Sequence, residues 1–249
     1  MLGKVRLRMI LSSPASEIEL FYWPTPNGFK VTIMLEELAV PYRVTPIDIA
    51  AGEQYSEEFT NVSPNNKIPA IKDSNPHHGN SPHPGKNAVT LFESGAILLY
   101  LAEKYGQFLP EDAPSRSQCL QWLFWQVGGL GPMGGQAHHF RIYAAEKIDY
   151  AITRYTQECH RLYAVMDRHL QNCEFMAGEY SIADIACVPW IYRHERQGQK
   201  LEDFPNLHGW YQNLMSRSAV TTGLAVGSEL RDDDAFSSEK GREVLFRID

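Results

Sequence analysis

The hydrophobic pattern of this 249-residue chain changes once, in the segment 106–114. Before it, short β-branched and aromatic runs alternate with apolar residues at helical spacing; after it, almost every apolar stripe has a helical period. The segment begins with Gly106 and ends with Pro114, two residues that interrupt regular structure. The pattern therefore predicts a mixed α/β domain over residues 18–106 and an all-helical domain over residues 114–226.

The first half predicts the order β-α-β, a break, and then β-β-α. A strand at 18–23 runs into the turn 24–28, and helical spacing follows from Phe29 until Pro41. The remaining predicted elements are strands at 42–49, 68–71 and 89–92 and a helix at 94–105 that Gly106 ends. A long polar insertion, 73–87, separates the last two strands and is expected to be a surface loop.

In the second half, Ser181 and Asp184 have the spacing of a capping box at the start of a helix. Residues 1–17 and the polar tail 227–249 are expected to lack regular structure. The start of the chain is basic and poor in acids, so it also resembles a mitochondrial presequence, but we favour a plain extension and a cytoplasmic location.

Charge and composition exclude several classes of protein. The chain has 30 acidic and 23 basic residues, and this balance argues against nucleic acid or an anionic membrane surface as a partner. No apolar run has the length of a membrane span. The four cysteines have no zinc spacing, which favours a reducing compartment, and the histidines of the insertion, His77, His78 and His83, do not form a recognisable metal motif.

The run Gly129-Leu130-Gly131-Pro132-Met133-Gly134 has the spelling of a dinucleotide-binding fingerprint. That fingerprint follows a strand, whereas this run follows a helical stripe and contains a proline. We therefore interpret it as a helix break where small residues let another helix or a ligand approach closely.

The turn between the first strand and the first helix holds candidate donors to a sulfur or another anion, Thr25 and Asn27. The alternative is that Asn27 only caps the helix and Thr25 fills the turn. Pro69 begins a strand, where a cis bond would leave neighbouring backbone groups free for an extended ligand. Glu93 and Ser94 stand at another helix start, suited to an ammonium and a carboxylate. Together these residues predict a site for a small zwitterionic peptide with a thiol.

On these motifs the chain resembles the cytosolic glutathione transferases over residues 17–226. It is most similar to the nu class, which contains glutathione-dependent disulfide-bond oxidoreductases, and more distantly to the yeast nitrogen regulator that forms a prion. The motifs that carry the resemblance are Pro24-Thr25-Pro26-Asn27-Gly28, Ser63-Pro64-Asn65-Asn66-Lys67-Ile68-Pro69-Ala70, Phe92-Glu93-Ser94-Gly95-Ala96, Gly131-Pro132-Met133 and Ser181-Ile182-Ala183-Asp184.

The resemblance implies a thioredoxin-like domain followed by the helical domain of these transferases. It implies that reduced or oxidised glutathione is bound, with Thr25 and Asn27 at its sulfur. The residues expected to hold the rest of the tripeptide are Gln54, Lys67, Ile68, cis-Pro69, Glu93 and Ser94. Arg154 is a weaker candidate with two interpretations: it reaches a ligand across the interface of a homodimer, or it is a solvated charge on a helix. Tyr22 is a second candidate for the hydroxyl role of Thr25.

Three functions stay open at this point. The first is reduction of small disulfides by bound glutathione, since the turn has no cysteine of its own. The second is conjugation of electrophiles or reduction of hydroperoxides by the same thiolate. The third is a regulatory or binding protein without catalysis on the same fold.

Overall fold

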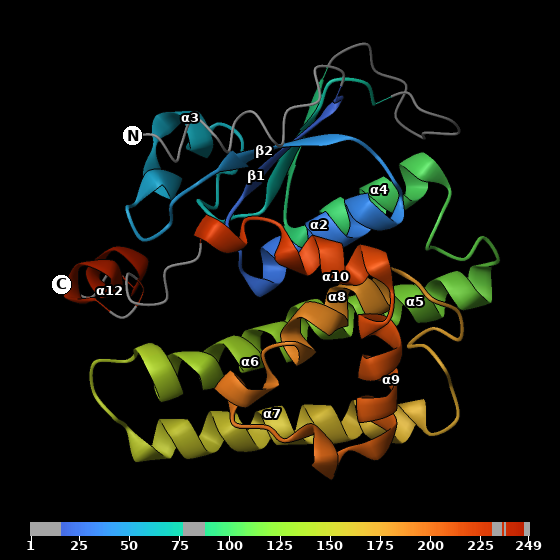
Figure 1. The fold of residues 1–249 in the computed structure, drawn as a ribbon, viewed down its shortest axis with the longest axis vertical. Helices are drawn as coiled ribbons and strands as arrows, with labels where there is room; N and C mark the ends of the chain where they lie inside the picture. The colour runs from blue at the N-terminus through green and yellow to red at the C-terminus, as the bar shows by residue number, and fades with distance from the viewer. Residues whose placement is uncertain (1–15, 77–87, 231–235, 237, 247–249) are drawn as a thin grey trace.

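The computed structural model describes residues 16–76, 88–230, 236 and 238–246 (Figure 1). A mixed sheet with its helices forms one half of the molecule, and a group of helices forms the other. The predicted extension before residue 16 and the loop histidines His77, His78 and His83 lie outside these ranges.

The sheet has four strands in the order β2-β1-β3-β4. Its strands are β1 (Ile18–Tyr22), β2 (Tyr42–Pro46), β3 (Ala70–Asp73) and β4 (Val89–Phe92). β1 pairs parallel to β2 and antiparallel to β3, and β4 is antiparallel to β3. β2 ends at Pro46, earlier than predicted, whereas β3 has the predicted length but begins at Ala70, two residues later than predicted. The carboxylate of Asp48 accepts the N–H groups of Ala50 and Ala51, which turns the chain after β2, and Pro69 has no N–H to join the ladder of β3.

Alternation along β1 divides the packing of this domain. Leu20 and Tyr22 belong to the large core under α2 (Pro26–Glu37) and α4 (Ser94–Tyr105), whereas Phe21 belongs to a smaller cluster with Phe59. Phe59 lies on the short helix α3 (Glu57–Thr60), which follows the 3₁₀ turn η1 (Glu53–Tyr55). The thioredoxin-like architecture predicted from the sequence is confirmed.

The second half is helical, as predicted. Its elements are α5 (Ala113–Trp125), the π-helical turn η2 (Gln126–Leu130), α6 (Gly131–His138), the π-helical turn η3 (His139–Tyr143), α7 (Asp149–Leu170), α8 (Ile182–Ile191), the 3₁₀ turns η4 (His194–Gln197) and η5 (Leu201–Asp203), α9 (Pro205–Met215), α10 (Ser218–Ala225) and the 3₁₀ turn η6 (Ser228–Leu230). The capping box predicted at Ser181 and Asp184 is present at the start of α8.

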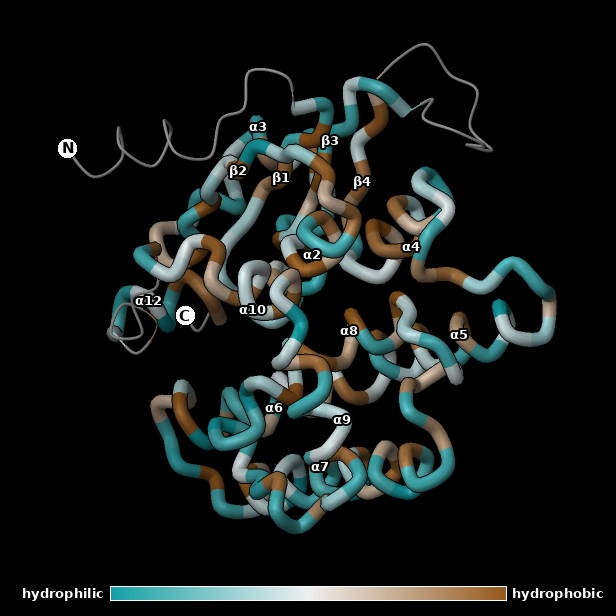
Figure 2. The backbone as a smooth tube through the Cα atoms, turned by 45° about the vertical axis from the view of Figure 1, so that its right-hand side comes forward, coloured by the Kyte–Doolittle hydropathy of each residue, from teal (hydrophilic) through white to brown (hydrophobic). Residues whose placement is uncertain are grey.

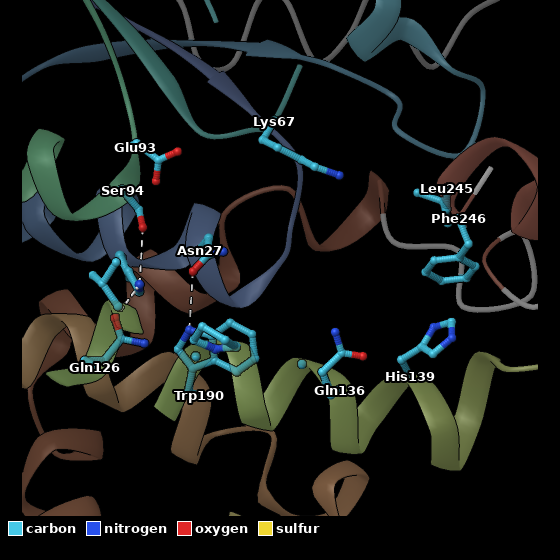
Figure 3. Close-up of a pocket in the computed structure, with 15 residues that line it drawn as sticks. Asn27, Lys67, Glu93, Ser94, Gln126, Gln136, His139, Trp190, Leu245 and Phe246 are labelled. Carbon is cyan, nitrogen blue, oxygen red and sulfur yellow. Dashed lines mark hydrogen bonds between the residues drawn. The ribbon is translucent and has the colours of Figure 1, made fainter. Parts of the chain in front are cut away.

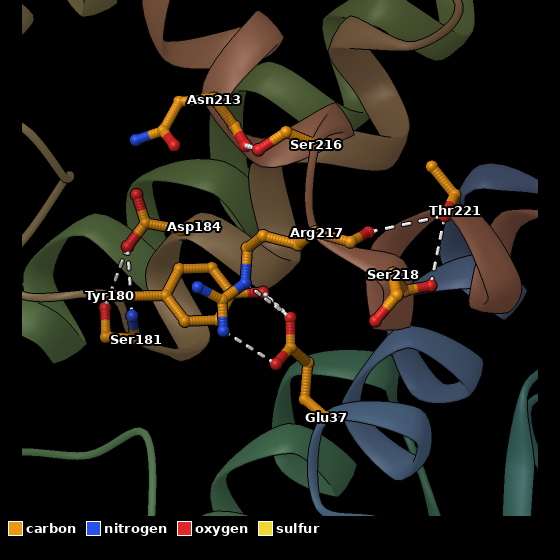
Figure 4. Close-up of polar contacts among 9 residues, drawn as sticks. All are labelled: Glu37, Tyr180, Ser181, Asp184, Asn213, Ser216, Arg217, Ser218 and Thr221. Atoms are coloured by element: carbon orange, nitrogen blue, oxygen red, sulfur yellow. Dashed lines mark hydrogen bonds and ion pairs between the residues drawn. The ribbon is translucent and has the colours of Figure 1, made fainter.

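The two halves dock mainly where α10 lies on α2. A Cβ on Gly223 would come within 2.6 Å of the Ile33 nitrogen, so this close approach requires glycine. At the far end of α2, Arg217 donates two hydrogen bonds to the Glu37 carboxylate, at 2.7 and 2.8 Å. The guanidinium also stacks 3.9 Å from the centre of the Tyr180 ring, and the Tyr180 hydroxyl donates to Glu37 (Figure 4). These three side chains clip the domains together.

The tail contains a helix that the sequence reading missed, α12 (Glu239–Phe246). Figures 1 and 2 both place α12 on the α3 side of the molecule, away from α5. The Tyr55 hydroxyl donates to the Val244 carbonyl at 3.4 Å, so α12 rests on η1. The expected lack of regular structure in the tail therefore does not extend to residues 239–246. The apolar residues of α12 meet partners from distant segments, since Phe246 packs against His139 and Tyr143 and Val244 accepts from Tyr55.

Among the described residues, none of the helices combines the length and apolar character that crossing a membrane requires. Across the same residues, His, Cys, Asp and Glu side chains form no group of three or more that could hold a metal ion.

Candidate functional site

A cleft of about 790 Å³ opens between the two halves (Figure 3). One wall is formed by α2, the loop before β3 and the start of α4, and the other by η2, α6, η3 and α8. Leu245 and Phe246 of α12 stand at one end of the cleft. The side chains on its surface are Asn27, Lys30, Lys67, Glu93, Ser94, Gln126, Val127, Pro132, Gln136, His139, Trp190, Leu245 and Phe246.

Thr25 is the N-cap of α2, and this corrects the alternative in which Asn27 takes that place. Its backbone is extended, and its Oγ1 accepts the Gly28 N–H at 3.3 Å. The hydroxyl oxygen therefore caps the helix by accepting a hydrogen bond, and the hydroxyl can still donate its proton to a ligand. Thr25 borders two smaller pockets that adjoin the main cleft, of about 250 and 210 Å³.

Asn27 lies in the first turn of α2 and faces the cleft. Its Oδ1 accepts the indole N–H of Trp190, on α8, at 3.3 Å. Thr25 and Asn27 thus bring a hydroxyl and an amide to the same helix start, where the dipole of α2 favours a negative charge.

Three polar side chains form the floor of the cleft. The Lys30 ammonium donates to the Gln126 Oε1 at 2.6 Å and to the Ser94 Oγ at 3.2 Å. Since an ammonium only donates, the Ser94 hydroxyl proton and the Gln126 amide N–H₂ both point away from Lys30. The Gln126 Nε2 has no partner among the described residues. The floor offers a cation and two neutral donors, which is a suitable set for a carboxylate.

Burial determines the charge of this floor. Lys30 is 2% exposed, and desolvation lowers its pKa to about 7. A carboxylate bound at Ser94 would favour the charged form. Glu93 stands beside Ser94 with its backbone at a φ of 69°, a strained value for a residue other than glycine, and its exposed carboxylate lines the cleft.

The pocket of about 210 Å³ continues the cleft along the loop before β3. It is lined by Gln54, Lys67 and Ile68 together with Thr25 and Asn27. The bond between Ile68 and Pro69 is cis, as predicted. The Gln54 side chain is buried, and its Oε1 has no partner among the described residues.

Two sequence candidates do not reach the cleft. Arg154 lies on α7 with its side chain 54% exposed, and it forms an ion pair with Glu158 at 3.8 Å. The Tyr22 side chain is fully buried, and its hydroxyl donates to the Val226 carbonyl at 2.8 Å. Burial also raises the pKa of Tyr22 far above its usual value, so this phenol stays neutral and remains hydrogen-bonded to Val226.

Sequence reasoning missed Lys30, Gln126, Trp190 and His139 as residues of the cleft. One signal was present for Lys30, because it follows Asn27 by three positions and so shares its helix face. Gln126 and Trp190 lie in the other half of the chain, and no local pattern marks them. Burial lowers the pKa of His139 below its usual value, so this imidazole is neutral at pH 7.

Comparison with known proteins agrees with this geometry. The family model of the glutathione S-transferase N-terminal domain matches residues 16–103, and that of the C-terminal domain matches residues 138–218. The chain is 50% identical to the disulfide-bond oxidoreductase YfcG of Escherichia coli (strain K12) over 217 residues, which is 87% of this chain and 98% of that protein.

Two solved structures are similar in fold and in sequence. One is a glutathione transferase from Pseudomonas putida with one glutathione disulfide bound per subunit; its TM-score is 0.79 at 41% identity, covering 91% of this chain and 99% of that one. The other is a family member from Pseudomonas fluorescens with two glutathione molecules bound; its TM-score is 0.77 at 41% identity, covering 88% and 97%. The cleft between a thioredoxin-like sheet and a helical domain, the two family models and the 50% identity together show that this chain belongs to the glutathione S-transferase family.

Proposed function

We propose that the protein binds glutathione in the cleft and uses the glutathione thiolate to reduce small disulfides. The observation that carries the proposal is that Asn27 lines both the main cleft, with its floor suited to a carboxylate, and the adjoining pocket that Thr25 borders. The bound glutathione disulfide and glutathione pair of the two Pseudomonas relatives support this assignment.

The residues present fit the tripeptide. Ser94, Lys30 and Gln126 would hold the α-carboxylate of the γ-glutamyl end, and Glu93 its ammonium. Gln54, Lys67 and the backbone of Ile68 would hold the rest, with cis-Pro69 shaping that backbone. The unpaired Gln126 Nε2 and Gln54 Oε1 are the buried groups that such a ligand would satisfy.

Thr25 and Asn27 would donate to the sulfur and so favour the thiolate over the thiol. Each unit by which they lower the thiol pKa corresponds to about 1.4 kcal/mol of preferential binding of the thiolate. When bound, glutathione supplies the attacking sulfur, so that one substrate disulfide and two glutathione thiols become two substrate thiols and one glutathione disulfide.

The experiment compares the wild type with Thr25→Ala and Thr25→Ser, using glutathione with a small disulfide and with an aromatic halide. We expect the disulfide rate to exceed the conjugation rate and to fall tenfold or more in Thr25→Ala, which corresponds to about 1.4 kcal/mol of barrier. Thr25→Ser keeps the hydroxyl and should keep most of the rate.

Two results would contradict the proposal. Conjugation or hydroperoxide reduction that dominates and survives Thr25→Ala would indicate a conventional transferase or peroxidase with another group at the sulfur. Tight glutathione binding without turnover of any of these substrates would indicate a regulatory or binding protein.

We also propose a homodimer in the cytoplasm. Exposed aromatic side chains, Phe92 at 37% and Phe124 at 66%, support an interface between copies of the chain, and four free cysteines suit a reducing compartment. Sedimentation equilibrium would measure the assembly state.

A further inference from the structure

The indole of Trp190 limits how Asn27 can present its side chain. The Trp190 Nε1 carries a hydrogen and can only donate, so the Asn27 atom that faces it at 3.3 Å must be the carbonyl oxygen. The Asn27 N–H₂ group is therefore turned away from Trp190, and Asn27 lines the cleft (Figure 3). An amide flipped by half a turn would present oxygen to the cleft instead, which repels a thiolate.

The Trp190 ring packs against a surface formed by the glycines of α6. A Cβ added to Gly131, Gly134 or Gly135 would lie 3.4, 3.1 or 3.5 Å from ring carbons of Trp190. The contact at Gly134 is tighter than ordinary van der Waals contact, so a side chain there would push the ring. The run that has the spelling of a dinucleotide fingerprint thus brings α6 against the Trp190 ring, with Gln126 beside Gly131 and Gln197 beside Gly134.

A second contact holds the Trp190 backbone. The Gln197 Nε2 donates to the Trp190 carbonyl at 2.8 Å, and the Tyr163 hydroxyl donates to the Gln197 Oε1 at 3.0 Å. All three residues are at least nine-tenths buried. The indole N–H of Trp190 is therefore held in one position against α2, although Trp190 lies on α8, in the other domain.

We infer that Trp190 is a positioning residue that orients the Asn27 amide so that its N–H₂ group, and not its oxygen, meets the glutathione sulfur. The inference rests on the proposed function, because it assumes that the sulfur lies at Thr25 and Asn27. It assigns to the helical domain a direct part in preparing the thiolate, through one hydrogen bond across the domain boundary.

The test is a double-mutant cycle of Trp190→Phe and Asn27→Ala, read by titrating the thiolate absorbance of bound glutathione. Trp190→Phe keeps an aromatic ring packed against the glycines of α6 but removes the N–H. We expect it to raise the pKa of the bound thiol by about one unit, since one hydrogen bond is worth about that much. In the Asn27→Ala background the same change should have less than about a twofold further effect on the thiolate fraction.

Trp210→Phe is the matched control. Its indole N–H also donates across helices, to Asp184 at 2.9 Å, but it does not line the cleft. We expect this variant to lose stability and to keep the thiol pKa. An effect of Trp190→Phe that is equally large with and without Asn27, or no effect on the thiol pKa, would overturn the inference.

A measurement without glutathione separates the two proposals. The indole N–H resonance of Trp190, assigned by its loss in Trp190→Phe, should exchange faster with solvent in Asn27→Ala because it loses its acceptor. Unchanged exchange would overturn the inference whatever the activity. Failure of the proposed function looks different: the wild type itself would not lower the pKa of the bound thiol or reduce a disulfide.

Discussion

Lys30 is the residue through which pH acts on the floor of the cleft. In the free protein desolvation lowers the pKa of the Lys30 ammonium to about 7, although Cys187 and Glu93 act in the opposite direction and favour the charged form. A bound carboxylate favours the ammonium, so above this pKa binding takes up a proton. Affinity should therefore be full below pH 7 and fall as the pH rises above it, by up to tenfold per unit.

S-Methylglutathione is the suitable probe for this prediction because it has no thiol to titrate. Calorimetry between pH 6 and 8 should show the fall in affinity with the wild type and a nearly flat profile with Lys30→Gln, because the amine of the ligand loses its proton only at higher pH. The same slope in both proteins would remove Lys30 from the binding of the carboxylate.

Tyr22 gives a second prediction for a single residue. Its hydroxyl is buried on the Val226 carbonyl, so it cannot activate a thiol in the cleft. Tyr22→Phe should keep the rate of disulfide reduction within about twofold and lower the free energy of unfolding by about 1 kcal/mol, the usual worth of one hydrogen bond. A tenfold loss of rate without unfolding would return Tyr22 to the site.

The first turn of helix α8 is held by a buried capping box around Asp184. The Asp184 carboxylate accepts the N–H groups of Met176 and Ser181 and the indole N–H of Trp210, at 2.9, 3.1 and 2.9 Å. Asp184→Ala would leave these buried donors unpaired and remove the capping box. We expect a loss of about 3 to 5 kcal/mol of unfolding free energy.

Denaturant unfolding would measure this loss, with Asp112→Ala as control. Asp112 caps α5 through the Ser115 N–H but is exposed, so water replaces its hydrogen bond and the loss should be much smaller. Equal losses of unfolding free energy in the two variants would show that burial does not determine how much a capping residue stabilises its helix.

For the whole molecule, the clip between Glu37 and Arg217 should hold the domains at the spacing that the cleft requires. The Glu37 side chain is only 7% exposed, so Arg217→Ala would leave a nearly buried carboxylate without its cation. We expect a loss of about 2 kcal/mol of stability and weaker glutathione binding, because both walls of the cleft depend on the docking.

The matched control is Arg161→Ala. Arg161 also makes two hydrogen bonds to one carboxylate, that of Glu158, but within α7 and in solvent. Exposed pairs of this kind contribute about 0 to 1 kcal/mol. If thermal unfolding and glutathione affinity respond alike to both substitutions, the clip has no special part in domain docking.

Local sequence determined the elements and part of the site. Hydrophobic periodicity and Gly106 predicted the bounds of α4, and the spacing of Ser181 and Asp184 predicted a cap that depends on one turn of helix. The placement of Thr25, Glu93 and Ser94 at helix starts also followed from short motifs, because a cap and the elements beside it lie within a few residues.

Tertiary structure alone decided which side chains complete the cleft and which way they face. Lys30 meets Gln126 across 96 positions, Trp190 meets Asn27 across 163, and α12 reaches η1 from the end of the chain. Arg154, by contrast, stays on an outer face of α7. Hydrophobic periodicity predicts which face of a helix a residue lies on. It does not predict which way the Asn27 amide is turned, because that depends on the Trp190 N–H packed against it, and Trp190 reaches Asn27 only when the two domains dock.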